Sequence, residues 1–485
     1  GGNSVSEHFN PVNDFSRMIE DRSGPETCNT YNMLRLTERL FRVKPEARLV
    51  DFYERALYNH ILSSQHPETG GYVYFAPMRP LHYRVYSTAE NNFWCCVGTG
   101  MENHSKYGAF IYAHDADGLY VNLFIPSELK WADRGITVRQ ENRFPEEPST
   151  RLTLTVDSPK TFALRIRRPV WVADGFAVTV NGQAQSAAAG EDGFVTIERE
   201  WRSGDVVEVQ LPMQIRVERL PDGSDYAALL YGPLALAAPA GDDDLVGLHA
   251  TSRPDRHVAE GPMRPLDEAP MLVADIDELP SLVKPVEGEP LTFTLAAAIR
   301  PDEFDDLKLI PFHRVHEQRY MIYWRTLGEQ EYAEAQVRLA AEEAERMALE
   351  TATIDRVVPG EQQPEVDHNV MLGESETGSH AGRSFRHGQR FGYDLRMRGE
   401  GPVELFITYW GADQRQFDIN INGRLLRTVN LAGNQGQRFY TERYPIPAEV
   451  LNAADDGLLR VEFVARPGSM AGGIFDVRLV RPQQQ

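Results

Sequence analysis

The stretch PETCNTYNMLRLTERLF (residues 25–41) decides how the chain begins, because it has the pattern of an amphipathic helix. Pro25 suits a first helical position, and apolar side chains then recur at helical spacing. Pro45 interrupts the pattern, and a second apolar face follows over residues 49–61. The two segments predict a helical hairpin, and a third short helix is expected over residues 96–107.

The pattern changes near residue 109. Residues 109–225 alternate apolar and polar side chains with a period of two, and Asn181-Gly182 is typical of a tight hairpin turn. They predict an antiparallel β-sandwich. The same alternation returns over residues 366–485, where Asn422-Gly423 repeats the turn signal, so a second sandwich is expected there.

Between the two predicted sandwiches the organisation is mixed. Residues 226–327 combine buried strands with Pro- and acid-rich loops, and residues 328–365 read as a helical connector followed by a linker at Gly360–Pro364. The predicted fold class is therefore multidomain α + β, with a helical segment over residues 1–108 and β modules after it. At about 150 residues per domain, 485 residues suggest about three domains.

Composition narrows the classes of partner. A net charge of −21 disfavours nucleic acid, which attracts a basic surface, whereas a neutral carbohydrate is compatible with it. No run of about 18 apolar residues is present, so no membrane span is expected. The sequence begins Gly1-Gly2-Asn3 without a signal peptide, so no targeting segment indicates the compartment, and a fragment is one interpretation.

All three cysteines precede residue 100. Cys95 and Cys96 are neighbours, and their Cα atoms, about 3.8 Å apart, lie closer than a disulfide usually requires. With Glu26 and Cys28 they form a set of thiols and a carboxylate that suits a tetrahedral zinc ion, if the two pairs lie at irregular helix starts. The alternatives are small buried hydrophobic side chains or a purely structural zinc; a redox pair is disfavoured because no C-x-x-C motif is present.

Three blocks of sequence resemble glycoside hydrolase families 127 and 146. The blocks are GGNSVSEHF (residues 1–9), GPETCNTYN (24–32) and NNFWCC (91–96), in the family order and at similar spacing. The resemblance extends through the first predicted sandwich. It implies a retaining β-L-arabinofuranosidase, with an (α/α)6 barrel followed by β-sandwich domains, acting on arabinofuranose-containing oligo- or polysaccharides.

The resemblance also implies roles for individual residues. Cys95 resembles the nucleophile and one of four zinc ligands, and the other ligands would be Glu26, Cys28 and Cys96. Glu7 resembles the acid/base and Tyr74 a substrate-binding tyrosine near the nucleophile. Chemistry alone leaves two rivals to the Glu7 assignment, Glu20 and Asp21.

A barrel of this kind needs about twelve helices, and only three are predicted here. Residues 1–108 would then be the C-terminal part of the barrel, with an uncovered apolar face that includes Leu34, Phe41, Phe52 and Ile61. Two hypotheses stay open: a hydrolase whose N-terminal part lies outside this sequence, or a catalytically incomplete zinc-containing, carbohydrate-binding or structural protein. The family favours a periplasmic or extracellular location, and the sequence does not indicate an oligomeric state.

The second predicted sandwich carries Tyr409, Trp410 and Asp418. These side chains suit a carbohydrate-binding face, but aromatic residues on strands more often belong to a core.

Overall fold

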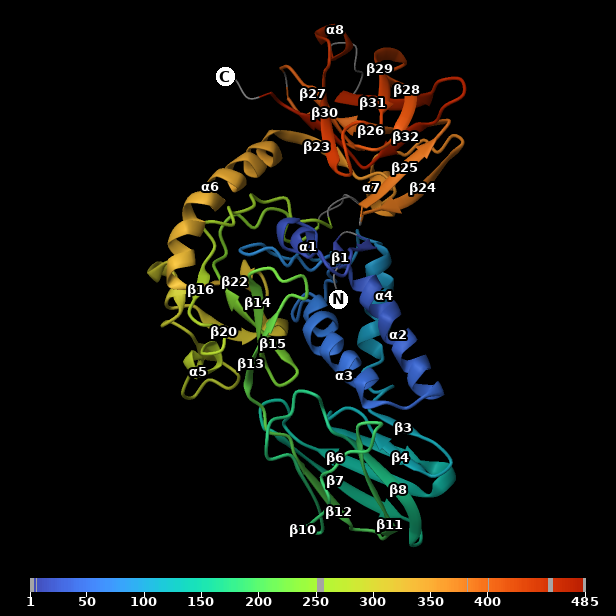
Figure 1. The fold of residues 1–485 in the computed structure, drawn as a ribbon. Coiled ribbons are helices and arrows are strands. Elements are labelled where there is room, and N and C mark those ends of the chain that lie inside the picture. The colour runs from blue at the N-terminus through green and yellow to red at the C-terminus, as the bar shows by residue number, and fades with distance from the viewer. Residues whose placement is uncertain are drawn as a thin grey trace.

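The computed structural model describes residues 4–5, 7–250, 257–381, 383–399, 401–451 and 457–482. Gly1, Gly2, Asn3 and Ser6 of the first sequence block lie outside the described residues. Figure 1 shows helices in the middle of the molecule, a β-sandwich at each end, and a mixed sheet beside the helices. The predicted order, a helical segment followed by β modules, is confirmed.

The helical segment is built around one long helix that packs against two shorter ones. Its elements are β1 (Ser4–Val5), β2 (His8–Phe9), α1 (Ser16–Glu20), α2 (Thr27–Val43), α3 (Ala47–Ala56) and α4 (Cys95–Ser105). A π-helical turn over Leu57–Ile61 and a 3-10 turn over Leu62–Ser64 continue α3. The residue after α2, Lys44, is extended because Pro45 follows it, which separates α2 from α3.

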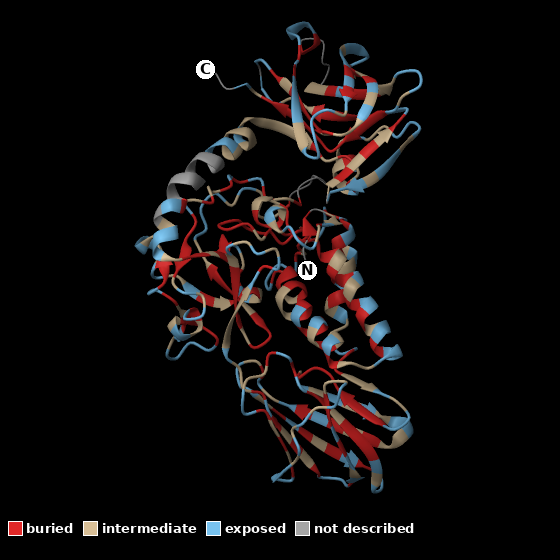
Figure 2. Ribbon diagram, viewed as in Figure 1, coloured by how far each residue is buried: buried red, intermediate tan, exposed pale blue. Residues whose placement is uncertain are grey.

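The apolar face expected to be uncovered is mostly buried. Leu34, Phe41 and Ile61 are at most 3% exposed, so the expectation is wrong for them, whereas Phe52 is 40% exposed. The first sandwich and the segment leading into it supply these contacts: the Phe41 ring lies edge-on, 5.1 Å from the ring of Phe110 and 5.7 Å from that of Tyr120. Other exposed large apolar side chains include Leu36, Leu40 and Val43 of α2, Phe93, and Met101 of α4. Figure 2 shows that buried and exposed residues alternate along these helices.

The first sandwich packs a six-stranded sheet against a four-stranded one. The strand orders are β10-β9-β12-β7-β6-β5 and β11-β8-β4-β3, antiparallel except for the parallel pair of β4 and β8. Its strands are β3 (Tyr112–His114), β4 (Gly118–Val121), β5 (Ser127–Trp131), β6 (Ile136–Glu141), β7 (Ser149–Val156), β8 (Lys160–Arg167), β9 (Ala177–Val180), β10 (Gln183–Ala184), β11 (Phe194–Trp201) and β12 (Val206–Gln210).

A buried ion pair joins this sandwich to α3. Arg167, at the end of β8, contacts the carboxylates of Glu54 and Asp51, and the Trp171 indole N–H donates to Glu54 at 2.7 Å. Arg167 and Glu54 are almost fully buried, so this contact fixes the helices against the sheet.

A ten-stranded mixed sheet follows, with β16 and β22 as a parallel pair. Its elements are β13 (Ile215–Arg219), β14 (Tyr226–Tyr231), β15 (Leu234–Pro239), β16 (Met271–Val273), α5 (Leu279–Leu282), β17 (Lys284–Pro285), β18 (Phe293–Thr294), β19 (Ile299–Arg300), β20 (Lys308–Pro311), β21 (Tyr320–Met321) and β22 (Tyr323–Leu327).

The long helix α6 (Glu329–Ala352) leads from this sheet to the C-terminal sandwich (Figure 1). The sandwich has sheets of four, three and four strands, and one continuous core. Its elements are β23 (Thr353–Val357), α7 (Gln362–Asp367), β24 (Ser375–His380), β25 (Arg383–Gly388), β26 (Arg390–Arg396), β27 (Glu404–Trp410), β28 (Gln414–Ile421), β29 (Arg424–Ala432), β30 (Phe439–Pro445), α8 (Ala448–Leu451), β31 (Leu458–Ala465), β32 (Ala471–Ile474) and β33 (Asp476–Val480).

The predicted connector over residues 328–365 contains more structure than a helix and a linker. Strand β23 pairs with β33, so the sheet begins before residue 366, and α7 begins within the predicted linker at Gln362. The sequence did not indicate β23 because its five residues follow directly after a helix and are too few to show a recognisable alternation of apolar and polar side chains. Its pairing partner, β33, lies more than 100 residues away.

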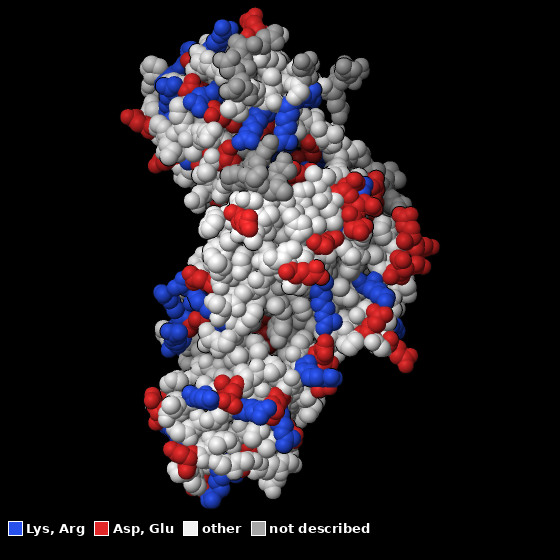
Figure 3. Space-filling view, turned by 180° about the vertical axis from the view of Figure 1, so that it is seen from behind, with Lys and Arg blue, Asp and Glu red and all other residues white. Residues whose placement is uncertain are grey.

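The charged surface agrees with the acidic composition. On the face seen in Figure 3, Asp and Glu side chains gather along one edge, and Lys and Arg side chains lie scattered, many of them beside acids. Among the described residues, no helix has the length and apolar character needed to cross a membrane.

Candidate functional site

At the start of α2 the side chains of Glu26 and Cys28 point toward the same site. Glu26 is extended and forms a bridge with Phe75, while the next residue, Thr27, already donates its N–H to the carbonyl of Tyr74 at 3.0 Å. The chain therefore turns from strand to helix between the two side chains, which lets a carboxylate and a thiol two residues apart converge. The same bridge places Tyr74 beside them.

Helix α4 brings the other two thiols. It begins at Cys95, directly after the extended Trp94, and it packs against α2. The first turns of two helices therefore meet at the cysteines. The first turn of a helix carries partial positive charge, which favours an ionised sulfur at such a position.

The four predicted ligands form one group. The Sγ atoms of Cys28 and Cys96 are 3.1 Å apart, and those of Cys95 and Cys96 are 3.9 Å apart. Glu26 Oε1 lies 3.7 Å from Cys95 Sγ and 3.6 Å from Cys96 Sγ. All four ligand atoms lie within 4.8 Å of one another. A tetrahedral ion with bonds of about 2.3 Å separates its ligands by about 3.8 Å, so the group has the dimensions of a metal site.

The electrostatics of the group also favour a cation. Burial, together with the nearby charges of Cys95 and Glu7, raises the pKa of Glu26 to about 8. Contact with Cys95 raises the pKa of Cys28, and burial raises that of Cys96, whereas contacts with those two thiols lower the pKa of Cys95. The protein alone thus stabilises one thiolate, and ionising all four groups needs a bound positive charge.

Exposure distinguishes Cys95 from the other ligands. Glu26, Cys28 and Cys96 are 6%, 9% and 1% exposed, whereas Cys95 faces solvent. Of the three thiols in the group, Cys95 is therefore the one that an external molecule can reach.

Glu7 is connected to this thiol through Tyr74. The Tyr74 hydroxyl donates to Glu7 Oε1 at 2.7 Å and lies 3.4 Å from Cys95 Sγ. Backbone N–H groups of Gln362 and Gln363, at the start of α7, donate to the Glu7 carboxylate at 2.8 and 3.3 Å. The C-terminal region therefore fixes the position of the Glu7 side chain.

Sequence reasoning did not identify several of these neighbours. The Thr99 hydroxyl lies 3.2 Å from Cys28 Sγ, and the His257 ring lies 4.5 Å from the Tyr74 ring. Thr99 lies four residues after Cys95, so helical spacing could have indicated it. Nothing local marks His257, or the contact of Gln362 and Gln363 with a carboxylate more than 350 residues away.

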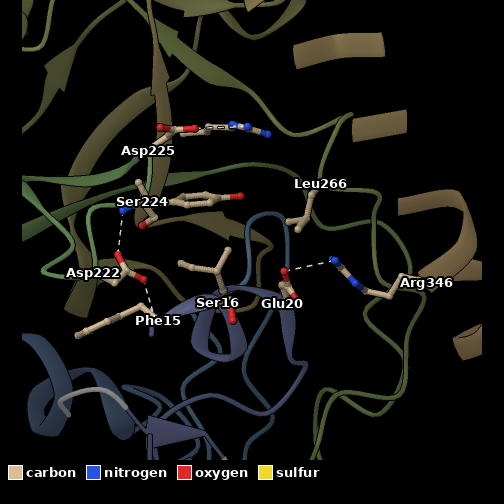
Figure 4. A pocket seen from close by; sticks show the side chains of 11 residues that line it. Phe15, Ser16, Glu20, Asp222, Ser224, Asp225, Leu266 and Arg346 are labelled. Atoms are coloured by element: carbon tan, nitrogen blue, oxygen red, sulfur yellow. Dashed lines mark hydrogen bonds and ion pairs between the residues drawn. The ribbon is translucent and has the colours of Figure 1, made fainter. Parts of the chain in front are cut away.

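The two rivals of Glu7 are held by arginines. Glu20 pairs with Arg346 at 3.3 Å, and Asp21 has a lowered pKa because the charges of Arg356 and Arg17 and hydrogen bonds from Ser23 outweigh its burial. Glu20 also borders a pocket of about 270 Å³ that contains no residue of the thiol group (Figure 4). That pocket is lined by Phe15, Ser16, Ile19, Glu20, Asp222, Ser224, Asp225, Tyr226, Leu266, Arg325 and Arg346.

Comparison with protein families gives four matches along the chain. Residues 1–109 match the catalytic domain of GH127 β-L-arabinofuranosidase, and residues 118–213 match the middle domain of the same enzymes. Residues 216–326 and 348–480 match two families of unknown function. No curated protein matches the chain.

Solved structures similar to the chain include a GH127 β-L-arabinofuranosidase from Geobacillus stearothermophilus T6, at 18% identity and a TM-score of 0.48, covering 67% of this chain and 54% of that one. A second GH127 β-arabinofuranosidase has 21% identity and a TM-score of 0.45, and the match covers 64% of this chain and 52% of that one. A family 35 carbohydrate-binding module from Clostridium thermocellum has 11% identity and a TM-score of 0.19, and the match covers 26% of this chain and 96% of that one.

The chain spans about half the length of the solved GH127 enzymes it matches. Within that span, the catalytic-domain match contains the whole thiol group together with Glu7 and Tyr74, and the middle-domain match coincides with the first sandwich. Residues 1–109 and 118–213 therefore carry the catalytic and middle domains of glycoside hydrolase family 127.

Proposed function

We propose that the chain carries the active site of a retaining β-L-arabinofuranosidase, which releases β-L-arabinofuranose from oligo- or polysaccharides. Cys95 is the nucleophile, Glu7 the acid/base and Tyr74 a substrate-binding residue. Glu26, Cys28, Cys95 and Cys96 hold a zinc ion. The observation that carries the proposal is the single exposed thiol in a buried ligand group, joined through Tyr74 to Glu7.

The donor set supports zinc as the metal. Three thiolates and one carboxylate are ligands that zinc accepts in tetrahedral geometry, while Ca²⁺ and Mg²⁺ prefer oxygen ligands. When bound, zinc supplies the positive charge that keeps all four groups ionised.

The positions of the side chains suit a two-step displacement. The Cys95 sulfur attacks the anomeric carbon, forming a C–S bond while the glycosidic C–O bond breaks and Glu7 gives a proton to the leaving oxygen. Glu7 then takes a proton from water, which attacks the same carbon, breaks the C–S bond and releases the sugar. Tyr74 contacts both Glu7 and Cys95, so it aligns the two reacting groups.

A second candidate function is binding of zinc and sugar without hydrolysis. It is considered because the chain spans only 54% and 52% of the length of the two GH127 structures. A chain that holds zinc and sugar without turnover would show the same metal group. Hydrolysis of an aryl β-L-arabinofuranoside by the 485-residue chain distinguishes the two candidates, because the incomplete protein would bind zinc and leave this substrate intact.

A covalent trap tests the nucleophile. After reaction with a mechanism-based arabinofuranose inhibitor and proteolysis, mass spectrometry should place the label on Cys95. A label on Glu7, Glu20 or Glu26 would replace the sulfur nucleophile by a carboxylate and overturn the proposed chemistry.

A further inference from the structure

A pocket of about 310 Å³ lies in the C-terminal sandwich, outside the thiol group and its neighbours. It forms where the end of β24, β25, the end of β27, the loop before β28, β28 itself and β32 come together. Its lining residues are Ser379, His380, Phe385, Trp410, Ala412, Asp413, Arg415, Gly473 and Phe475. We propose that this pocket binds a neutral sugar unit of a glycan chain, independently of the site around Cys95.

One wall of the pocket is aromatic. Trp410 is half-buried, and its ring lies 4.5 Å from the His380 ring and 5.0 Å from the Phe439 ring. The ring of Phe475, which is 4% exposed, lies edge-on, 4.8 Å from the Phe439 ring. The Trp410 ring is thus held in place by other rings while part of it stays accessible. A rigid aromatic face of this kind can pack against the apolar C–H face of a sugar ring.

The pocket is also lined by a polar, half-buried ion pair. Asp413 and Arg415 form an ion pair of 3.3 Å, with side chains only 22% and 18% exposed. Arg415 also donates to His387 Nδ1 at 3.1 Å, which fixes the guanidinium. Gly473 leaves room for this pair, because a Cβ there would lie 2.1 Å from Asp413 Oδ2. A carboxylate beside a guanidinium offers acceptors and donors to neighbouring hydroxyl groups.

The charge of the pocket selects the class of ligand. Asp413 and Arg415 neutralise each other, and His380 and His387 lie beside them, so with both rings in the neutral form neither an anion nor a cation gains a net attraction there. A neutral polyhydroxyl ring uses both the aromatic wall and the polar pair. The pocket volume lies at the lower end of the range of about 300–1,000 Å³ for small-molecule sites, which suits one or two sugar units.

The structure separates the three residues that the sequence placed on one possible sugar-binding face. Tyr409 is fully buried in the core, and Asp418 lies on the surface, bonded to Arg466 and Thr428. Of the three, only Trp410 lines the pocket. Its polar partner there is Asp413, three residues further along the chain.

Native gel electrophoresis of the full chain in soluble polysaccharide tests the proposal. The probes are an arabinan, a xylan, a galactomannan and, as the charged comparison, polygalacturonate. The chain carries Cys95→Ser to prevent turnover, and at least one neutral polysaccharide should retard it. Trp410→Ala and Asp413→Asn should each weaken this binding at least tenfold.

The matched control is Trp131→Ala. Trp131 is also half-buried at the end of a strand and lies 4.8 Å from a histidine ring, but it belongs to the first sandwich. This variant should bind as the parent does. Asp413→Asn keeps the shape of the pocket, so it remains informative if Trp410→Ala unfolds. The proposal would be overturned if polygalacturonate alone retarded the chain, or if no polysaccharide retarded it. It would also be overturned if both pocket variants were retarded as strongly as the parent. None of these results depends on the thiol chemistry.

Discussion

Replacing Cys28 by serine removes one thiol from the proposed zinc group with little change in shape. Cys28 lies in the first turn of α2, is 9% exposed and has its sulfur 3.1 Å from Cys96 Sγ. A serine hydroxyl stays protonated near neutral pH, so it cannot replace the thiolate as a charged ligand. The remaining donors are two thiols and the Glu26 carboxylate.

The expected loss of affinity follows from the number of ligands. Four-ligand zinc sites bind with about 10–16 kcal/mol near pH 7, which is about 3 kcal/mol for each ligand. Since about 1.4 kcal/mol corresponds to a tenfold change, Cys28→Ser should weaken zinc binding by about 100-fold.

The assay is metal analysis combined with chelator competition. Protein purified without chelator should contain about one equivalent of zinc, and Cys28→Ser should lose it to a chelator concentration that leaves the parent loaded. Ser105→Ala, an exposed change on the same helix as Cys95, should keep the parent affinity. Metal-free parent protein of normal stability would refute the zinc assignment, and an unchanged affinity of Cys28→Ser would remove Cys28 from the ligand set.

Three further predictions concern the site, its scaffold and its acid stability. Tyr74→Phe removes the hydroxyl that contacts Glu7 and Cys95, so kcat on an aryl β-L-arabinofuranoside should fall by about 10- to 100-fold; parent-like kcat would contradict an aligning role. Arg167→Ala leaves the buried Glu54 charge without its partner and should cost about 3–5 kcal/mol in denaturant unfolding, whereas Arg151→Ala, in an exposed pair, should cost less than about 1 kcal/mol. Burial acts to raise the pKa of Asp476, but the charges of Arg356 and Arg478 outweigh it and lower that pKa. The ionised Asp476 therefore contributes fully to the free energy of unfolding above about pH 4, and this contribution is lost as the pH falls. Thermal unfolding of Asp476→Asn should therefore show a smaller loss of stability in acid than the parent. If both proteins lost the same stability as the pH falls, Asp476 would not be a source of the acid sensitivity.

The sequence predicts each half of the thiol group because the geometry of each half is local, whereas the prediction that the two halves meet, 69 and 70 residues apart, rests on their ligand chemistry and the family resemblance. Glu26 and Cys28 straddle one helix start, Cys95 and Cys96 open another, and Pro25 marks the first boundary. Turn chemistry of this kind depends on a few neighbouring residues, which a single sequence displays. The same holds for the tight hairpins of the sandwiches, such as the turn between β9 and β10 at Asn181-Gly182.

Contacts between distant segments leave no such local pattern. The N–H groups that hold Glu7 belong to Gln362 and Gln363, whose side-chain identities are irrelevant to a backbone hydrogen bond. The burial of Phe41 likewise depends on Phe110 and Tyr120, which belong to the sandwich and its approach, so counting helices alone overestimated the uncovered surface. In both cases tertiary packing, not a local pattern, determines the outcome.

The choice between Cys95 and Cys96 as nucleophile shows what the two kinds of information contribute together. The residues are identical and adjacent, and in the sequence only the family resemblance separates them. On a helix, successive side chains point about 100° apart, so one of the pair can face the core while the other faces outward. Cys96 is 1% exposed and has a raised pKa because it is buried, whereas Cys95 faces solvent, has a lowered pKa and lies beside Tyr74. Because bound zinc would keep both sulfurs ionised, accessibility decides between them, and of the two it is Cys95 that an external molecule can reach. This physical reason supports the role that the resemblance implies for Cys95 and the proposal that Cys96 serves as a zinc ligand.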